Sequence, residues 1–181
     1  AESLATNGDF ETGDASGWTE WKSPWGGPIF YDYAWTDPFE GGSSLHLNAP
    51  SGSFGIYQEL CVEPGVPIHI DWAWKGATAG NGWWEVQIVD APYSYLAVDD
   101  PANHPETFLA SKWEIGFGGP YPGPSADWVV EGADMTPTSE VVTLVLKCGS
   151  VSGGLVDAWF DAVIFNHVTV VLEVTEVVPA L

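Results

Sequence analysis

Near the start of the chain stands Asn7-Gly8-Asp9-Phe10-Glu11-Thr12-Gly13, and near its end stands Trp159-Phe160-Asp161-Ala162-Val163. Each motif puts a carboxylate, Glu11 or Asp161, beside an aromatic residue in an otherwise apolar stretch. Buried acids need a neutralising partner, and two acids from opposite ends of a chain can share one. The two motifs therefore predict one domain whose ends meet, with a bound cation as the candidate partner.

Length and composition are those of a single all-β domain. With 181 residues, the chain can bury most of its apolar surface in one core, and no stretch resembles an interdomain linker. Its 21 glycines and 14 prolines are spread along the whole length, between short runs rich in Val, Ile, Tyr, Trp and Thr. We expect one domain over residues 1–181.

The charge of the chain excludes one class of partner. The chain has 25 acidic and 4 basic residues, and its formal net charge is -21 at pH 7. Such a surface repels nucleic acids and anionic membranes, which proteins bind through Lys and Arg. It suits salts, divalent cations or neutral ligands, or is simply a solvated acidic surface.

Other features of the sequence bear on where the protein works. No run of about 18 apolar residues is present, so we expect no membrane span. A start at Ala1 without a basic leader is typical of a secreted chain whose signal peptide has been removed. Cys61 and Cys148 both fall in expected strands. They are compatible with a disulfide in an oxidising compartment and equally with two buried thiols.

Two stretches, residues 67–75 and 83–89, alternate clearly between apolar and polar positions. In the first, the apolar set predicts one core-facing side and the polar set an outer side. The core-facing candidates are Ile68, Ile70, Trp72 and Trp74, and the opposite positions are His69, Asp71, Ala73 and Lys75. In the second, Trp84, Val86 and Ile88 face the core, opposite Trp83, Glu85, Gln87 and Val89.

Two segments do not follow this pattern. Residues 90–127 lose regular alternation and are rich in Pro, which predicts a long ordered loop, because their aromatic content argues against disorder. Residues 167–178 are nearly continuous β-branched sequence. An exposed strand of this kind invites pairing with another chain. It either pairs within the domain, exchanges between subunits, or forms a spacer over residues 166–181.

In its order of motifs, the chain resembles the galactose-binding-like β-sandwich, and within it the carbohydrate-binding modules of families 4, 16 and 22. The motifs that carry the resemblance are Asn7-Gly8-Asp9-Phe10-Glu11, Gly17-Trp18, Gly41-Gly42-Ser43-Ser44-Leu45-His46-Leu47, Gln58 with Val62-Glu63-Pro64-Gly65, Trp128 with its following strands, and Trp159-Phe160-Asp161-Ala162-Val163-Ile164-Phe165. They cover nearly all of the chain except residues 90–127. The resemblance implies a jelly roll of two antiparallel sheets.

The resemblance also implies a structural calcium ion where the first and last motifs meet. Glu11 and Asp161 would supply side-chain oxygens, and Asp9 and Ser43 would supply backbone carbonyls. Calcium takes six to eight oxygen ligands, and a mixture of carboxylates and carbonyls suits it. For Asp9, a solvated turn residue is an equally good interpretation.

In such modules, sugar is held on the concave sheet face or in loops at the sandwich edge. We expect the polar face of residues 83–89 and that of residues 67–75 to lie on neighbouring strands and form one binding surface. Its members would be Trp83, Glu85, Gln87, His69, Asp71 and Lys75. The candidates for an edge site are Trp25, Tyr31, Trp35, Trp113 and Tyr121. By the same resemblance, Trp18, Trp128 and Trp159 are assigned to the core.

No catalytic constellation appears in the sequence. There is no Gly-x-Ser-x-Gly elbow, the four histidines lack zinc-like spacing, and no strand carries a cluster of carboxylates. His69 beside Asp71 is more typical of a surface pair. The leading hypothesis is a secreted, non-catalytic module that binds a neutral polysaccharide. The alternative is a matrix, sheath or filament subunit that associates through its C-terminal strand.

Overall fold

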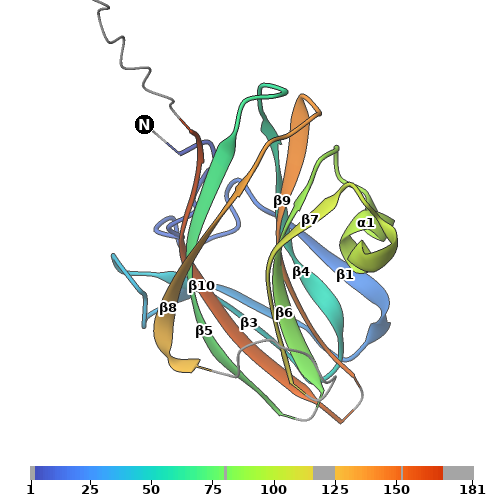
Figure 1. Ribbon diagram of the computed structural model, residues 1–181. Coiled ribbons are helices and arrows are strands. Elements are labelled where there is room, and N and C mark those ends of the chain that lie inside the picture. The colour runs from blue at the N-terminus through green and yellow to red at the C-terminus, as the bar shows by residue number, and fades with distance from the viewer. Residues whose placement is uncertain (1–2, 80, 116–124, 152, 169–181) are drawn as a thin grey trace, which may run out of the picture.

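The computed structural model describes residues 3–79, 81–115, 125–151 and 153–168, which form a sandwich of two five-stranded antiparallel sheets (Figure 1). The first sheet has the order β1-β4-β9-β6-β7, with strands at Thr19–Gly26, Gly52–Cys61, Val141–Ser150, Gly82–Val89 and Thr107–Ile115. The second sheet has the order β2-β3-β10-β5-β8, with strands at Phe30–Trp35, Ser44–Ala49, Leu155–His167, Ile68–Ala79 and Ser125–Met135. The expected all-β antiparallel sandwich is confirmed.

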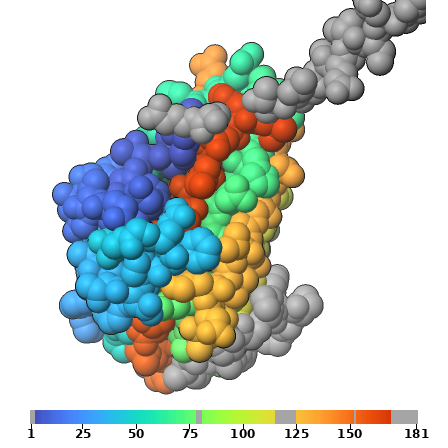
Figure 2. All heavy atoms as spheres, turned by 90° about the vertical axis from the view of Figure 1, so that its left-hand side faces the viewer, coloured from blue at the N-terminus to red at the C-terminus, as the bar shows by residue number. Residues whose placement is uncertain are grey.

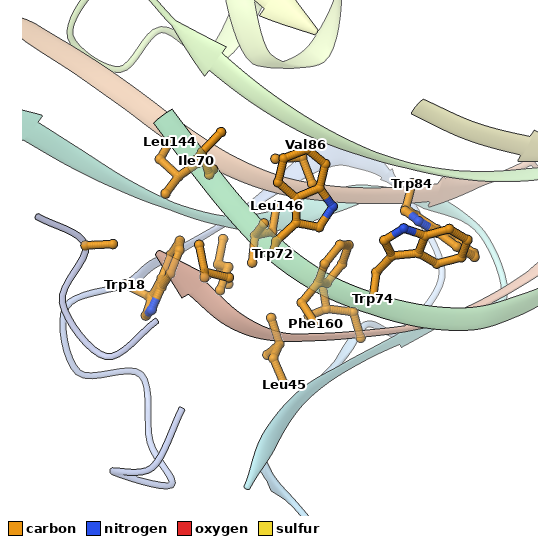
Figure 3. Packing of buried hydrophobic residues seen from close by; sticks show 14 of the residues in the cluster. Trp18, Leu45, Ile70, Trp72, Trp74, Trp84, Val86, Leu144, Leu146 and Phe160 are labelled. Carbon is orange, nitrogen blue, oxygen red and sulfur yellow. The ribbon is translucent and has the colours of Figure 1, made fainter. Parts of the chain in front are cut away.

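The core lies between the two sheets and is rich in indole rings (Figure 3). Trp72 and Trp74 of β5 point inward, as their alternation predicts, and are almost fully buried. Trp74 packs against Trp84 of β6 with ring centroids 4.9 Å apart, and Trp84 stacks on Trp113 of β7 at 4.0 Å. Burial of these large apolar rings is the main force that holds the two sheets together.

One short helix covers part of the outer face of the first sheet. Helix α1 (Tyr95–Asp99) begins after Ser94, whose hydroxyl caps it by accepting a hydrogen bond from the Ala97 amide. A single 3-10 turn, η1 (Pro101–Asn103), follows it. The helix buries a second, smaller apolar cluster against β1, β6 and β9, made of Trp21, Val89, Ala97, Val98 and Val145. The outer face of the first sheet is therefore partly closed, as Figure 1 shows.

The two end motifs meet, as the sequence predicts. The amide of Val163 donates to the Gly8 carbonyl at 2.9 Å, and the amide of Leu4 donates to the Phe165 carbonyl at 2.7 Å. At this point β10 changes its register between Asp161 and Ile164. On either side of the start of this irregularity, Phe160 belongs to the core cluster and Asp161 is fully buried.

The prediction of a continuous loop over residues 90–127 is wrong. Helix α1, η1, strand β7 and the start of β8 fall within it. Trp113, expected at an exposed edge, lies on β7 and is 1 % exposed. Tyr121 lies outside the described residues. Local alternation failed to reveal β7 because its pairing with β6 shifts between Val86 and Gln87, which breaks the period of two.

Three further expectations concern the cysteines and the tail. Both thiols are free, with Cys61 exposed and Cys148 buried. Asn166 and His167 continue β10, whereas residues 169–181 lie outside the described residues, so association through the tail stays a prediction. None of the described helices is long and apolar enough to cross a membrane.

Candidate functional site

A row of large side chains crosses the outer face of the second sheet. Strands β3, β10 and β5 pair so that Trp159 lies opposite His46 on one side and opposite Lys75 on the other. Phe160, next to Trp159 in sequence, is fully buried in the core, because successive residues of a strand point to opposite faces. On β8 the row ends with Trp128, whose ring centroid lies 4.9 Å from Lys75 Nζ.

An aromatic stack forms one half of this row. The rings of His46 and Trp159 lie 4.5 Å apart and are nearly parallel, at 6°. Trp35, at the end of β2, packs against both rings at 4.5 and 5.9 Å. The Asp157 carboxylate contacts His46 Nε2 at 2.8 Å and accepts a hydrogen bond from Asn48 at 2.6 Å. The contact with Asp157 fixes the orientation of the imidazole ring on which Trp159 stacks.

Lys75 forms the other half of the row. Its side chain lies between the indole rings of Trp128 and Trp159, with Nζ 4.9 and 5.5 Å from their centroids. This is the distance range of a cation–π interaction. Its ammonium group also forms an ion pair with Asp37. Lys75 is one of only 4 basic residues in the chain, and it is 8 % exposed.

Beside this row lies a pocket of about 560 Å³. Its residues are Trp35, Asp37, Lys75, Gly76, Ala77, Ser125, Ala126 and Trp159. We call it the Trp35–Trp159 pocket. Small residues of β5 and β8, among them Gly76, Ala77 and Ala126, form part of its lining. A Cβ on Gly76 would overlap the Asp157 carbonyl, and the φ of +152° at this position also favours glycine.

Three buried polar atoms in the row have no hydrogen-bond partner among the described residues. They are Nδ1 of His46 and Nε1 of Trp128 and Trp159. Buried polar groups in native proteins are paired in the great majority of cases. Outside the row, Nε1 of Trp21 and of Trp72 is also unpaired within the part of the chain that the structure describes, so the unpaired atoms do not by themselves assign the row a function. Figure 2 looks onto this side of the molecule, where the segment after β2, in cyan, lies beside β8, in yellow-orange.

The structure separates the two halves of the expected binding surface. Strand β5 belongs to the second sheet and β6 to the first. Their outer faces therefore point to opposite sides of the sandwich, and the prediction that Trp83 and Lys75 share one surface is wrong. Of the six predicted members, Lys75 lies at the Trp35–Trp159 pocket.

Glu85 and Gln87 are buried, not exposed, at 4 % and 0 %. Lys147 Nζ lies 3.3 Å from Glu85 and donates to the carbonyls of Val98 and Asp99 at 2.9 and 3.0 Å. Gln87 donates to Glu85 at 2.6 Å. These contacts anchor the end of helix α1 to the sheet, so the two side chains have a structural role.

Trp83 borders a smaller pocket of about 270 Å³ over the same network. Its ring packs flat on Gly149, where a Cβ would overlap it. The neighbouring charges are paired with each other, since Lys112 lies 3.0 Å from Glu114 and 3.8 Å from Glu85. Paired charges are found in the Trp35–Trp159 pocket as well, but that pocket has about twice the volume and two indole rings in its lining, so it is the stronger candidate for ligand binding.

His69 and Asp71 lie on the same outer face as Lys75, but six and four residues along β5 from it, roughly 20 and 13 Å away. His69 bridges two carboxylates, with Nδ1 2.6 Å from Asp134 and Nε2 3.0 Å from Asp71. These hydrogen bonds to the two carboxylates, above all the one that Asp134 accepts, raise the pKa of His69. The group is exposed and distant from the pocket.

This bridge predicts a pH dependence that Asp134→Asn would reveal. Because the pKa of His69 is raised in the folded state, its stabilising effect is present below its unfolded pKa of about 6.5 and is lost as the pH rises through the folded value. Asp134→Asn should lower the pKa of His69, measured by NMR titration. It should also lower the melting temperature relative to wild type more at pH 5.5 than at pH 9. An equal difference at both pH values would contradict the interpretation.

Two edge candidates lie apart from the Trp35–Trp159 pocket. Trp25 is 48 % exposed near the end of β1, in the first sheet. Tyr31 is half-buried, with its ring edge-on to Phe54 and its hydroxyl donating to the Trp21 carbonyl at 2.9 Å. Burial raises the pKa of Tyr31. These contacts make Tyr31 a packing residue of β2.

Trp128 and Trp159, assigned to the core by resemblance, lie on the outer face. Both are half-buried and border the row described above. Alternation in the sequence itself carried the signal: Val156, Ala158 and Phe160 are apolar and buried, so the intervening Trp159 must point outward. Trp18 is in the core, as expected.

The carboxylates of the two end motifs bind one turn. Glu11 accepts hydrogen bonds from the amides of Gly42 and Ser43 at 2.7 and 2.9 Å. Asp161 accepts from Phe39 and Glu40 at 2.8 and 3.2 Å. We call Glu11 and Asp161 the carboxylate pair.

Asp161 is fully buried, and burial raises its pKa to about 6. A buried carboxylate of this kind suits a nearby cation. Among the described residues, no three His, Cys, Asp or Glu side chains are grouped to hold a metal ion. A calcium ion here would therefore draw on backbone carbonyls as well as the carboxylate pair. Asp9 contacts the Glu11 amide at 3.4 Å through its side chain.

Comparison with known structures places this geometry in context. The module TmCBM61, in complex with β-1,4-galactotriose, aligns over 92 % of this chain and 99 % of its own, with a TM-score of 0.57 and 12 % identity. A family 4 carbohydrate-binding module aligns over 90 % and 99 %, with a TM-score of 0.57 and 17 % identity. The CBM22-1 xylan-binding domain of Paenibacillus barcinonensis Xyn10C aligns over 90 % and 93 %, with a TM-score of 0.54 and 16 % identity.

The chain has the fold of these modules. The resemblance expected from the motifs is thus confirmed for the fold. No protein-family model matches the sequence, and no curated protein matches it either.

Proposed function

We propose that the protein is a non-catalytic module that binds a neutral polysaccharide in the Trp35–Trp159 pocket. The observation that carries this proposal is the pocket itself, which combines indole walls, an ion pair and an open floor of small residues on an exposed sheet face. The solved structures of similar fold, among them one bound to β-1,4-galactotriose and a xylan-binding domain, support it.

The chemistry of the pocket suits a sugar. Pyranose rings have flat C–H faces that pack on indoles, and their hydroxyl groups pair with carboxylates and ammonium groups. Trp35 and Trp159 supply the indoles, and Asp37 and Lys75 supply the charged partners. The net charge of -21 repels an acidic polymer, so the ligand is neutral. Such a module acts outside the cell, where polysaccharides are found.

A binding panel tests the proposal directly. Affinity electrophoresis and calorimetry should show binding to at least one of β-glucan, mannan, xylan and β-1,4-galactan, and none to polygalacturonate. Incubation with the bound polymer should release no reducing sugar, because glycoside hydrolysis uses two carboxylates and, among the described residues that line the pocket, Asp37 supplies one. Failure to bind every neutral glycan of the panel would overturn the proposal.

We further propose a calcium ion at the carboxylate pair, with the carbonyls of Asp9 and Ser43 as additional ligands. If the ion binds the folded state alone, at a hundredfold excess over its Kd it stabilises the protein by about 2.7 kcal/mol. EDTA should then lower the melting temperature by roughly 5–10 °C for a chain of this size.

Two variants separate calcium binding from a general effect of EDTA. Asp161→Ala should already have the lower melting temperature and should not respond to EDTA. Asp14→Ala, which removes an exposed carboxylate directly after the first motif that contacts Thr12 and Ser16, should respond like wild type. Equal melting temperatures of the wild type in EDTA and in calcium would contradict the proposed site.

A further inference from the structure

The loop between β2 and β3, residues 36–43, connects the carboxylate pair with the Trp35–Trp159 pocket. Its second half holds the carboxylate pair: the amides of residues 39, 40, 42 and 43 all donate to Glu11 or Asp161. Its first half reaches the Trp35–Trp159 pocket. Glu11, from the start of the chain, and Asp161, from near its end, therefore hold the part of the loop that follows the pocket.

On the pocket side, two loop residues contact the aromatic row. Asp37 forms the ion pair with Lys75 and lines the pocket. Phe39 packs edge-on against Trp128, with ring centroids 6.1 Å apart. The Asp37 side chain is 71 % exposed, so its position depends on the backbone that carries it and on Lys75.

The amides that the carboxylate pair binds begin two residues after Asp37. Hydrogen bonds to an ionised acceptor are stronger than those between neutral groups, and four of them converge on this short segment. The fit at Gly41 is close: a Cβ there would overlap the Glu11 carboxylate, and its φ is +68°. These four hydrogen bonds and the close fit at Gly41 hold the turn against both carboxylates.

We propose that Glu11 and Asp161 are positioning residues of the ligand site: by holding residues 39–43, they place Asp37 and Phe39 at the pocket. The expected effect of the carboxylate pair on ligand binding rests on the proposed function. Its effect on the position of the loop rests on geometry alone. The carboxylate pair thus has a role in recognition, in addition to stability. This role requires no metal ion, because the hydrogen bonds come from the protein itself.

Glu11→Ala tests the inference, because Glu11 is exposed and the fold does not depend on its burial. Measured in EDTA, the variant should bind the glycan about tenfold more weakly, which is the size of one lost hydrogen bond to a charged group. Asp14→Ala is the matched control with the same change in net charge, and it should bind like wild type. Gly41→Ala, which leaves both carboxylates in place but separates them from the turn, should weaken binding in the same way.

A double-mutant cycle distinguishes positioning from a general loss of stability. If Glu11 acts through Asp37, Glu11→Ala should have little further effect in an Asp37→Ala background. Equal fold-changes in the two backgrounds would overturn the inference, and so would unchanged affinity in both Glu11→Ala and Gly41→Ala.

The NMR signal of the Trp128 indole N–H provides a readout that does not depend on any ligand. It is assigned with Trp128→Phe, and it should shift in Glu11→Ala but not in Asp14→Ala, because Phe39 moves from the ring. A shift together with absence of glycan binding by wild type would contradict the proposed function and leave the positioning role standing. An unmoved signal would overturn the positioning role whatever the protein binds.

Discussion

Replacing Trp159 with alanine should weaken glycan binding by roughly thirtyfold or more. Trp159 forms a wall of the pocket and lies between His46 and Lys75, so its loss removes the packing surface and releases both neighbours. Aromatic side chains at the centre of a binding site typically contribute at least about 2 kcal/mol, and every 1.4 kcal/mol is tenfold in Kd. Calorimetry against the polysaccharide that wild type binds measures the loss.

The fold should survive this change, because Trp159 lies outside the core. The stacking with His46 is worth about 0.5–1.5 kcal/mol, and circular dichroism should show an intact sandwich with a slightly lower melting temperature. Trp83→Ala is the matched control on the opposite sheet and should bind like wild type. Ala126→Trp should block binding by filling the pocket, without removing any side chain that contacts the ligand.

The two sets of variants together locate the site. Loss of binding in Trp83→Ala, with Trp159→Ala and Ala126→Trp unaffected, would move the site to the smaller pocket of the first sheet. Loss in all three would indicate a general effect on folding, which the melting temperatures would detect.

The second large effect concerns stability. Lys147→Ala should lower the free energy of unfolding by about 3 kcal/mol, at the lower end of the range for removing one partner of a buried ion pair. Lys147 and Glu85 are 2 % and 4 % exposed, so the remaining carboxylate stays buried, with the Gln87 amide at 2.6 Å and Lys112 at 3.8 Å beside it. The carbonyls of Val98 and Asp99 also lose their donor.

Thermal unfolding should show a melting temperature lower by roughly 6–12 °C for a chain of this length. The double variant Lys147→Met with Glu85→Gln should recover part of this loss, because a neutral pair leaves no uncompensated buried charge. Glycan affinity measured well below the melting temperature should not change, since the network lies under α1 on the first sheet. A change of less than about 1 kcal/mol in Lys147→Ala would show that Lys112 replaces it.

Much of the fold could be predicted from local pattern. The alternation of residues 67–75 correctly assigned Trp72 and Trp74 to the core, because the direction of a side chain along a strand depends only on its position in that strand. The same rule, applied to Val156, Ala158 and Phe160, places Trp159 on the outer face. Resemblance to known modules assigned it to the core, and the local pattern was the better guide.

The choice of partner strands could not be predicted in this way. β5 and β6 are neighbours in sequence, but they pair with β10 and β9 and so lie in different sheets. That pairing depends on contacts between strands far apart in the chain, which no local period encodes. It separated Trp83 from Lys75, and it brought Lys75 beside Trp159.

The sequence by itself determined that the two ends of this chain meet, because each end motif carries a carboxylate that needs a partner. The expectation that both carboxylates are buried is correct for Asp161 and wrong for Glu11, which is exposed. Only the tertiary structure decided what that partner is within the protein. The backbone amides of residues 39–43 reach Glu11 and Asp161 because β3 pairs with β10 and carries the preceding loop to the end motifs. A carboxylate binds whichever donors the fold brings within hydrogen-bond distance, and here those donors belong to the loop that also forms a wall of the pocket.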